Sequence, residues 1–357
     1  MALCKYFICE VLISLTFISA ALGNISKPLW SNAIIEDQNE IDDPHIVSAM
    51  NWNQYHNLSV IYDFLHQINN KFPQITRVDN IGVTVEGRDI KVLRISADHQ
   101  DGKTIFIEGG IHPREWISPS TTTFVLNELV TKWHNLSGHL KNITWYIMPV
   151  ANPDGYVYSQ EVDRFWRKNR AMINGSTCRG VDLNRNFNVD WGVSDTSNDP
   201  CAENFGGHSA FSEPETLAIS NFLYEHRNNL EAYLTFHSYD QVISYPWAYK
   251  SEKDYSTKEW QRICKIAANR IEETTGKTYK CSATYESYGS VSGVSTDWAR
   301  AECDVKYPYV IELRDMGEYG FFLPPSQIVD AGKEGLIVVE AVADVISSIY
   351  EFEFVLY

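Results

Sequence analysis

Two residues that lie three positions apart, His112 and Glu115, could bind one metal ion. They follow an apolar, β-branched run, 104–108, and a Gly-Gly turn, a pattern typical of a buried strand and the loop after it. An imidazole nitrogen and a carboxylate at this spacing can reach one Zn²⁺ from the same side. Catalytic zinc sites use three protein ligands, and His237, at the end of the apolar run 232–236, is the third candidate. The sequence therefore predicts a His–Glu–His zinc site.

Strand-like and helix-like segments alternate along the chain, which predicts an α/β sandwich with a mixed, largely parallel twisted sheet. In such sheets ligands bind beyond the carboxyl ends of the strands. His112, His237 and Glu312 each lie at or just past the end of an expected strand. The region 156–212 has no long periodic run and is expected to be a functional loop. The expected strands are 90–95, 104–108, 144–150, 232–236 and 307–313, and the expected helices are 59–72, 118–133, 213–227, 256–275 and 333–350.

The composition suits a globular protein of one large domain or two ordinary ones, since the 357 residues are 44% hydrophobic and 21% charged. The formal net charge is −16, and no block of Lys and Arg occurs. A nucleic-acid binder needs a basic face, and an anionic membrane surface also attracts basic segments. We therefore expect neither nucleic acid nor a membrane as a partner, and we expect a monomer.

The N-terminal residues 1–22 have the features of a secretory signal peptide: one Lys near the start, an apolar core, and small residues before a cleavage point. A membrane anchor is the alternative, but the apolar run is too short to span a bilayer. Residues 23–50 are polar and acidic, which predicts a flexible leader. The protein is therefore expected to be secreted and extracellular.

The cysteines and the glycosylation sequons agree with secretion. An odd number of cysteines remains after the expected signal peptide, so at least one thiol is unpaired or bound to another molecule. No Cys-x-x-Cys pair occurs, which argues against a cysteine-ligated structural zinc. The remaining cysteines are Cys178, Cys201, Cys264, Cys281 and Cys303. The Asn-x-Ser/Thr sequons are at Asn24, Asn57, Asn135, Asn142 and Asn174.

Several longer segments carry a family resemblance. They are 111–117 (IHPREWI), 163–170 (DRFWRKNR), 180–187 (GVDLNRNF), 236–239 (FHSY) and 311–321 (IELRDMGEYGF). In order and spacing they resemble the zinc carboxypeptidases of the funnelin type, and within them the pancreatic carboxypeptidase A/B subfamily. The resemblance implies a three-layer α/β/α sandwich, a catalytic domain over 51–352, and one Zn²⁺ per chain. It also implies that the C-termini of peptides and proteins are the substrates.

The resemblance assigns roles to the candidate residues. The two histidines and Glu115 would bind zinc, which polarises the scissile carbonyl and lowers the pKa of a bound water. Asp182 would hold the first zinc histidine in one tautomer. Glu312 would be the general base, and Arg167 would stabilise the oxyanion. Taken alone, Asp182 could cap a turn and Glu312 could pair with Arg314 at the end of a strand.

Other residues are implied on the substrate side. Asn184 and Arg185 would grip the terminal carboxylate, because a guanidinium fork binds a carboxylate bidentately. Tyr288 would be the mobile tyrosine that closes over the substrate. The loop after it is one residue longer than in the family, so Tyr285 is the alternative. Further implied substrate-binding residues are Arg114, Tyr239 and Phe321. For each arginine, a surface salt bridge is the alternative.

The specificity pocket is expected to be neutral. Thr296 matches the position at its bottom, and the resemblance places Ser244, Ala248 and Val310 around it. An acidic residue at the Thr296 position would indicate basic substrates. A neutral pocket lined by small groups instead predicts uncharged C-terminal residues, aliphatic or aromatic.

Two other functions stay open on the sequence alone. The chain could be a catalytically inactive, peptide-binding member of the same fold, although the full set of candidate residues is present. It could also be a prohormone-processing carboxypeptidase, which the neutral pocket argues against. The family's digestive zymogens carry a prodomain, and the leader at 23–50 is too short for one, so we expect secretion without that zymogen lock. The resemblance also implies a Cys178–Cys201 disulfide and leaves the pairing of the other three cysteines open.

Overall fold

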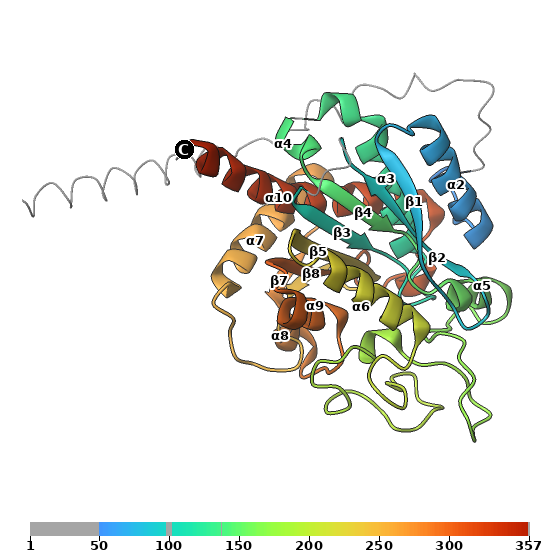
Figure 1. The fold of residues 1–357 in the computed structure, drawn as a ribbon. Coiled ribbons are helices and arrows are strands. Elements are labelled where there is room, and N and C mark those ends of the chain that lie inside the picture. Colours follow the sequence, from blue (N-terminus) through green and yellow to red (C-terminus); the bar gives the residue numbers. More distant parts are fainter. Residues whose placement is uncertain (1–49, 98–101, 137, 356–357) are drawn as a thin grey trace, which may run out of the picture. The chain divides into compact units, whose positions relative to one another are not determined.

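The computed structural model describes residues 50–97, 102–136 and 138–355 (Figure 1). The expected signal peptide and, apart from Met50, the expected leader lie outside these residues. The strands are β1 (Thr76–Val83), β2 (Asp89–Ile95), β3 (Thr104–Glu108), β4 (Thr144–Met148), β5 (Leu230–Ser238), β6 (Val242–Tyr245), β7 (Lys280–Ala283) and β8 (Tyr307–Leu313). They form one mixed eight-stranded sheet in the described part of the chain, in the order β1-β2-β4-β3-β5-β8-β6-β7.

The central strands β4, β3, β5 and β8 run parallel to one another. Every residue of β3 and β5 is buried, as expected when helices cover both faces of a parallel sheet. This position explains their apolar, β-branched composition, because each side chain meets a packed layer. The carboxyl ends of these neighbouring strands share one edge of the sheet.

Helices cover both faces of the sheet (Figure 1). They are α2 (Leu58–Lys71), α3 (Ile117–Thr131), α4 (Gly138–Lys141), α5 (Pro153–Glu161), α6 (Pro214–His226), α7 (Thr257–Thr275), α8 (Thr284–Tyr288), α9 (Ser295–Cys303) and α10 (Ile328–Val355). Helices α3, α7 and α10 pack together on one face, and α6 and α9 pack on the other. The expected three-layer α/β/α sandwich is confirmed.

The sequence patterns place most of the larger elements correctly. The expected strands 104–108 and 307–313 coincide with β3 and β8. The patterns miss the strands β1, β6 and β7. The first lacks an alternation of buried and exposed residues, and the other two, with four residues each, are too short to establish a period.

The residues Asn152-Pro-Asp-Gly155 have the composition of a turn and predict one after the expected strand 144–150, but this prediction is wrong because they begin α5. The Asn152 side chain caps this helix by accepting from the Gly155 N–H, and Pro153 occupies the first turn, where its missing N–H costs nothing. The region 156–212, expected to be a loop throughout, therefore begins with helical residues up to Glu161.

Two disulfides are present. Cys178 and Cys201 are bonded, as the resemblance implied, and Cys264 is bonded to Cys281. Cys303 is a buried free thiol. The first bridge closes the segment that carries Asp182 and Arg185.

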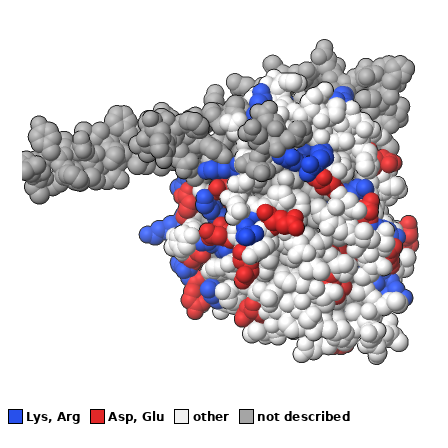
Figure 2. Space-filling view, in the orientation of Figure 1, with Lys and Arg blue, Asp and Glu red and all other residues white. Residues whose placement is uncertain are grey.

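Charged residues of both signs are interspersed on the face seen in Figure 2. On this face, Lys and Arg form no extended patch. Among the described residues, we find no helix with the length and apolar composition needed to cross a membrane.

Glu340, on α10, is a fully buried carboxylate whose two oxygens have no hydrogen-bond partner among the described residues. Burial raises its pKa to about 8. An unfolded chain therefore loses this proton at lower pH than the folded protein does, and stability falls as the pH rises from the ordinary pKa of about 4.3 towards 8.

Glu340→Gln removes the charge at this position and is expected to stabilise the protein more at pH 8 than at pH 5. The melting temperature of variant and wild type, measured at both values, checks this. The exposed variant Glu318→Gln is the control. An equal change at both pH values would count against a raised pKa at Glu340.

Candidate metal centre and substrate cleft

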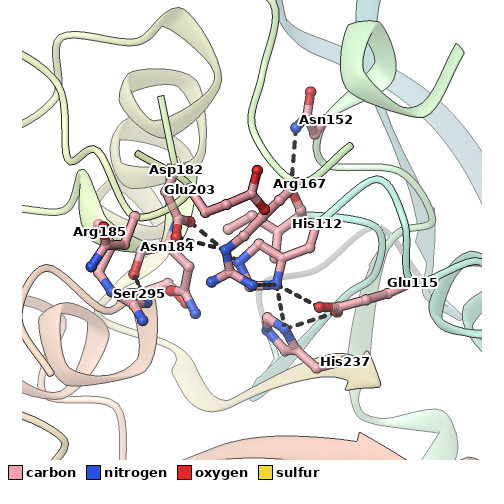
Figure 3. A network of polar contacts seen from close by, with 12 residues as sticks. His112, Glu115, Asn152, Arg167, Asp182, Asn184, Arg185, Glu203, His237 and Ser295 are labelled. Atoms are coloured by element: carbon pink, nitrogen blue, oxygen red, sulfur yellow. Dashed lines mark hydrogen bonds and ion pairs between the residues drawn. The ribbon is translucent and has the colours of Figure 1, made fainter. Parts of the chain in front are cut away.

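His112, Glu115 and His237 are buried and come together at the carboxyl edge of the sheet (Figure 3). One ligand atom from each lies within 4.8 Å of the other two. His112 Nδ1 is 2.8 Å from Glu115 Oε1, and His237 Nδ1 is 3.2 Å from Glu115 Oε2. The first two residues lie in the turn after β3, and His237 lies near the end of the adjacent strand β5. Parallel pairing of β3 with β5 thus brings the two halves of the site together.

The arrangement of these donors fits a zinc ion. The two histidine Nδ1 atoms are only 3.2 Å apart, so they cannot both carry a proton towards each other. The other ring nitrogens face protein oxygens: His112 Nε2 is 3.3 Å from Asp182 Oδ1, and His237 Nε2 is 3.1 Å from Thr235 Oγ1. The Asp182 carboxylate can only accept, so it favours the His112 tautomer with an unprotonated Nδ1, which is the form that binds metal. Three protein ligands are the number found in catalytic zinc sites.

The local charges also suit a cation. Burial lowers the pKa of His112, and Arg167 lowers it further. Burial opposes the charge on Glu115, yet the two histidines hold its pKa well below the usual range. Burial likewise opposes charge on His237, but the Glu115 carboxylate and other nearby carboxylates raise its pKa overall. An ionised carboxylate beside two imidazoles is a ready-made site for a divalent ion.

Asp182 links the metal centre to Arg167 (Figure 3). It is fully buried, and its carboxylate accepts hydrogen bonds from the Arg167 Nε–H at 2.9 Å and the Asn184 backbone N–H at 3.1 Å. Burial opposes this charge, but Arg167 and other partners hold the pKa of Asp182 well below its usual range. Arg167 in turn approaches within 3.5 Å of His112 Nδ1. One carboxylate therefore orients both a metal ligand and a cation.

Glu312 lies beside the metal ligands on the next strand. It is the register partner of His237 in the parallel pair β5–β8, and its side chain lines the cleft. Burial raises the pKa of Glu312 to about 8, although the nearby His237 lowers it. A carboxylate whose pKa lies near neutrality can both accept and return a proton.

A cleft of about 490 Å³ opens at the metal centre and is also lined by Asn184 and Arg185. Arg185 donates from Nε to the Asp195 carbonyl at 2.9 Å and from Nη2 to Asp195 Oδ2 at 2.7 Å. It also donates from Nη1 to the Asn184 carbonyl at 3.0 Å. Among the described residues these contacts occupy three of the five guanidinium N–H groups. One N–H on each terminal nitrogen is left for a carboxylate. The Asn184 side-chain oxygen accepts from the Ser295 N–H, which leaves its amide NH₂ as a donor.

Aromatic side chains form another part of the cleft wall. Tyr239 and Phe321 both line the cleft, with ring centroids 5.0 Å apart. Tyr288 lines it as well, and its hydroxyl is 3.4 Å from Asp240 Oδ2. Tyr285 lies instead in a separate cavity beside Trp247. This placement favours Tyr288 over Tyr285 as the tyrosine that meets a ligand.

The sequence profile of the family described as zinc carboxypeptidase matches residues 61–337. The chain belongs to the zinc carboxypeptidase family. It is 38% identical over 306 residues to carboxypeptidase B of Astacus astacus, a match that covers 84% of this chain and 100% of the relative. The carboxypeptidase is therefore an enzyme, and its expected cofactor, zinc, is confirmed by the family. The buried His–Glu–His cluster could hold this ion.

Solved structures of similar proteins have the same fold as this carboxypeptidase. The bovine thrombin-activatable fibrinolysis inhibitor, solved with a tick carboxypeptidase inhibitor, matches with a TM-score of 0.79 at 33% identity, over 83% of this chain and 98% of that one. Carboxypeptidase A from Helicoverpa armigera matches with a TM-score of 0.79 at 30% identity, over 90% of this chain and 79% of that one.

Four residues of the carboxypeptidase that were predicted at the substrate or its specificity pocket do not line the cleft: Arg114, Ser244, Ala248 and Thr296. Arg114 donates to Glu203 Oε2 at 2.9 Å, and its guanidinium lies 4.6 Å from the centre of the Phe321 ring. Thr296 is fully buried on α9, and its hydroxyl has no partner among the described residues. Their roles in substrate binding stay predictions.

The sequence patterns miss other residues of the site. Asp195, the partner of Arg185, lies in a loop without periodicity, where no pattern distinguishes it from other acidic residues. In the sequence, Thr235 is only one residue of an apolar strand, although in the structure its hydroxyl contacts His237. Both contacts depend on the folded path of the chain.

Proposed function

We propose that this carboxypeptidase is secreted and removes single C-terminal residues from peptides and proteins, with a preference for neutral residues and with Glu312 as the general base. The observation that carries the proposal is that Arg185 and Asn184 line the same cleft as the zinc ligands and Glu312. A guanidinium fork beside a hydrolytic centre selects substrates that end in a free carboxylate. An enzyme that cuts inside chains has no use for it.

The protein groups have distinct roles in the proposed reaction. Zinc, when bound, acts as a Lewis acid and makes water nucleophilic near neutral pH. Arg185 and Asn184 hold the terminal carboxylate and so place the last peptide bond beside Glu312. The Glu312 carboxylate takes a proton from the attacking water and passes it to the leaving amine. Arg167, held by Asp182, donates N–H groups to the oxygen on which negative charge develops.

The cleft supports a neutral preference. Its wall includes the uncharged residues Thr284, Val291, Val294 and Val310. Asp195 and Asp240 also line it, but the first is bonded to Arg185 and the second faces the Tyr288 hydroxyl. An apolar wall favours aliphatic or aromatic side chains over charged ones.

Secretion is supported by the two disulfides, which persist in oxidising compartments. The four described sequon asparagines are all exposed: Asn57, Asn135, Asn142 and Asn174. Expression of the whole chain in a eukaryotic cell is expected to deliver the protein to the medium, with a mass that an N-glycosidase reduces. Retention inside the cell without glycan would contradict this part of the proposal.

Hydrolysis of matched peptides tests the proposed activity. Blocked dipeptides ending in Phe, Leu, Glu, Lys or Arg would be offered with a free or an amidated terminus, with and without a zinc chelator. We expect chelator-sensitive cleavage of free termini, fastest for Phe or Leu. Faster cleavage of Lys or Arg would overturn the neutral preference, and zinc-loaded protein that cleaves none would favour an inactive binding protein.

Arg185→Met is expected to lower kcat/KM on free termini by at least about 30-fold, because losing one partner of a buried charge pair costs about 2 kcal/mol or more. The discrimination between free and amidated termini should shrink with it. Arg179→Met, an exposed change in the same disulfide loop, is the control. Unchanged discrimination in the Arg185 variant would show that another group reads the terminus.

A further inference from the structure

Glu108 is a fully buried carboxylate that the proposed reaction does not use. It is the last residue of β3, a central strand in which all other side chains are apolar apart from Thr104. Its register partner on the adjacent strand β5 is Thr235. Burying a carboxylate is costly unless its oxygens receive hydrogen bonds. Its surroundings therefore indicate what this carboxylate does.

Both Glu108 oxygens face hydroxyl groups from β5. The Tyr233 hydroxyl donates to Oε2 at 2.5 Å, and the Thr235 hydroxyl donates to Oε1 at 3.4 Å. The same Thr235 Oγ1 lies 3.1 Å from His237 Nε2. A continuous polar path thus leads from Glu108 through one hydroxyl to a zinc ligand.

This path allows only one direction of donation when Glu108 is ionised. A carboxylate has no proton, so the single hydroxyl proton of Thr235 points to Glu108. The Thr235 oxygen can then only accept from His237, which places the imidazole proton on Nε2. The Nδ1 that faces Glu115 and His112 is left with its lone pair free. A threonine hydroxyl alone could point either way and would not select a tautomer.

We propose that Glu108, acting through Thr235, is a positioning residue that keeps His237 in its zinc-binding tautomer. Its role for His237 parallels that of Asp182, which faces Nε2 of the other zinc histidine. Each of the two histidines is therefore held by a carboxylate, His112 directly and His237 through a hydroxyl. This inference concerns zinc binding and goes beyond the proposed peptide hydrolysis.

The zinc dissociation constant of folded protein, measured by competition with a chromogenic chelator, tests the proposal without any assay of activity. Thr235→Val removes the hydroxyl and is expected to weaken zinc binding by about 10- to 100-fold, the range typical of groups that support metal ligands. Thr235→Ser keeps the hydroxyl and should restore affinity. Glu108→Gln retains the shape but replaces a carboxylate, which only accepts hydrogen bonds, with an amide that can also donate. The Thr235 hydroxyl is then no longer forced to point at residue 108, so zinc binding should weaken as well.

Two control variants distinguish a loss of His237 positioning from a general effect of removing a buried hydroxyl on packing. Thr122→Val removes another fully buried threonine hydroxyl, one that donates to the Ser118 carbonyl on α3. Tyr309→Phe removes a buried hydroxyl that donates to the Trp260 carbonyl. Both should bind zinc as the wild type does, even where they lower the melting temperature.

Nitrogen-15 chemical shifts of His237 in the metal-free protein provide a second readout. The wild type is expected to show the Nε2–H tautomer, and Glu108→Gln should show a mixture. A folded Thr235→Val or Glu108→Gln protein with wild-type zinc affinity would overturn the inference. So would an equal loss of affinity in Thr122→Val. If Thr235→Val does not fold, Glu108→Gln decides. Protein that binds zinc but cleaves no peptide would count only against the proposed function.

Discussion

Replacing Glu312 with Gln is expected to lower kcat by about 10²- to 10⁴-fold, the range that general acid–base groups contribute, while zinc content is retained. The amide has nearly the same shape as the carboxylate but cannot take a proton from water. Glu312 lies next to His237 in the sheet without being one of the three clustered ligands, so zinc should stay bound. Steady-state kinetics and metal analysis of the purified variant check both parts.

The control is Glu318→Gln, which removes an exposed carboxylate a few residues further along the chain. It should leave kcat and zinc content unchanged. A Glu312→Gln enzyme with near wild-type kcat would show that another group acts as the base.

Glu312 is also expected to make kcat/KM depend on pH. Burial raises the pKa of Glu312 to about 8 in the cleft without metal, and a zinc cation lowers the pKa of a nearby carboxylate. The base must be ionised to act, so kcat/KM should rise with pH along a limb whose midpoint lies below 8. This limb is expected to disappear from the residual activity of the Gln variant.

Asp182→Asn is expected to damage two functions at once. The amide can no longer hold the His112 tautomer by charge, so zinc affinity should fall by about 10- to 100-fold. It also leaves Arg167 without its ionic partner at 2.9 Å. The kcat of the fully zinc-loaded variant should therefore be low as well. Chelator competition measures the first effect, and kinetics at saturating zinc measures the second.

Asp163→Asn, an exposed change close to Arg167 in sequence, should alter neither quantity. The Asp182 and Glu312 variants are expected to differ in kind, since only the first should lose zinc. An Asp182→Asn enzyme that regains full kcat when zinc is in excess would mean that Arg167 does not depend on this carboxylate.

The cluster of candidate metal ligands was predictable because each ligand lies at or just after the end of a run with a strong apolar pattern. The run 104–108 ends shortly before His112, and the carboxyl ends of parallel strands meet at one edge of the sheet. The strand pattern placed Glu312 at the same sheet edge, but its role as general base was implied only by the resemblance, since its own surroundings in the sequence favour an ion pair with Arg314.

The supporting contacts were not predictable, because they depend on register and loop path. Glu108 reaches Thr235 only because β3 and β5 pair in one particular register. The partnership of Asp195 with Arg185 depends on how an irregular loop returns to the cleft. Neither relation leaves a spacing that a single sequence can reveal.

The Cys178–Cys201 bridge has a consequence for where the enzyme can be made. The bridged segment contains Asn184, Arg185 and Asp195, whereas the three zinc ligands lie outside it. We expect a chain made in a thiol-rich cytoplasm to hold chain ends poorly. Because Asp182 lies in the same bridged segment, that chain should also bind zinc less tightly. Oxidation of two cysteines would then complete substrate recognition and metal affinity in a single step.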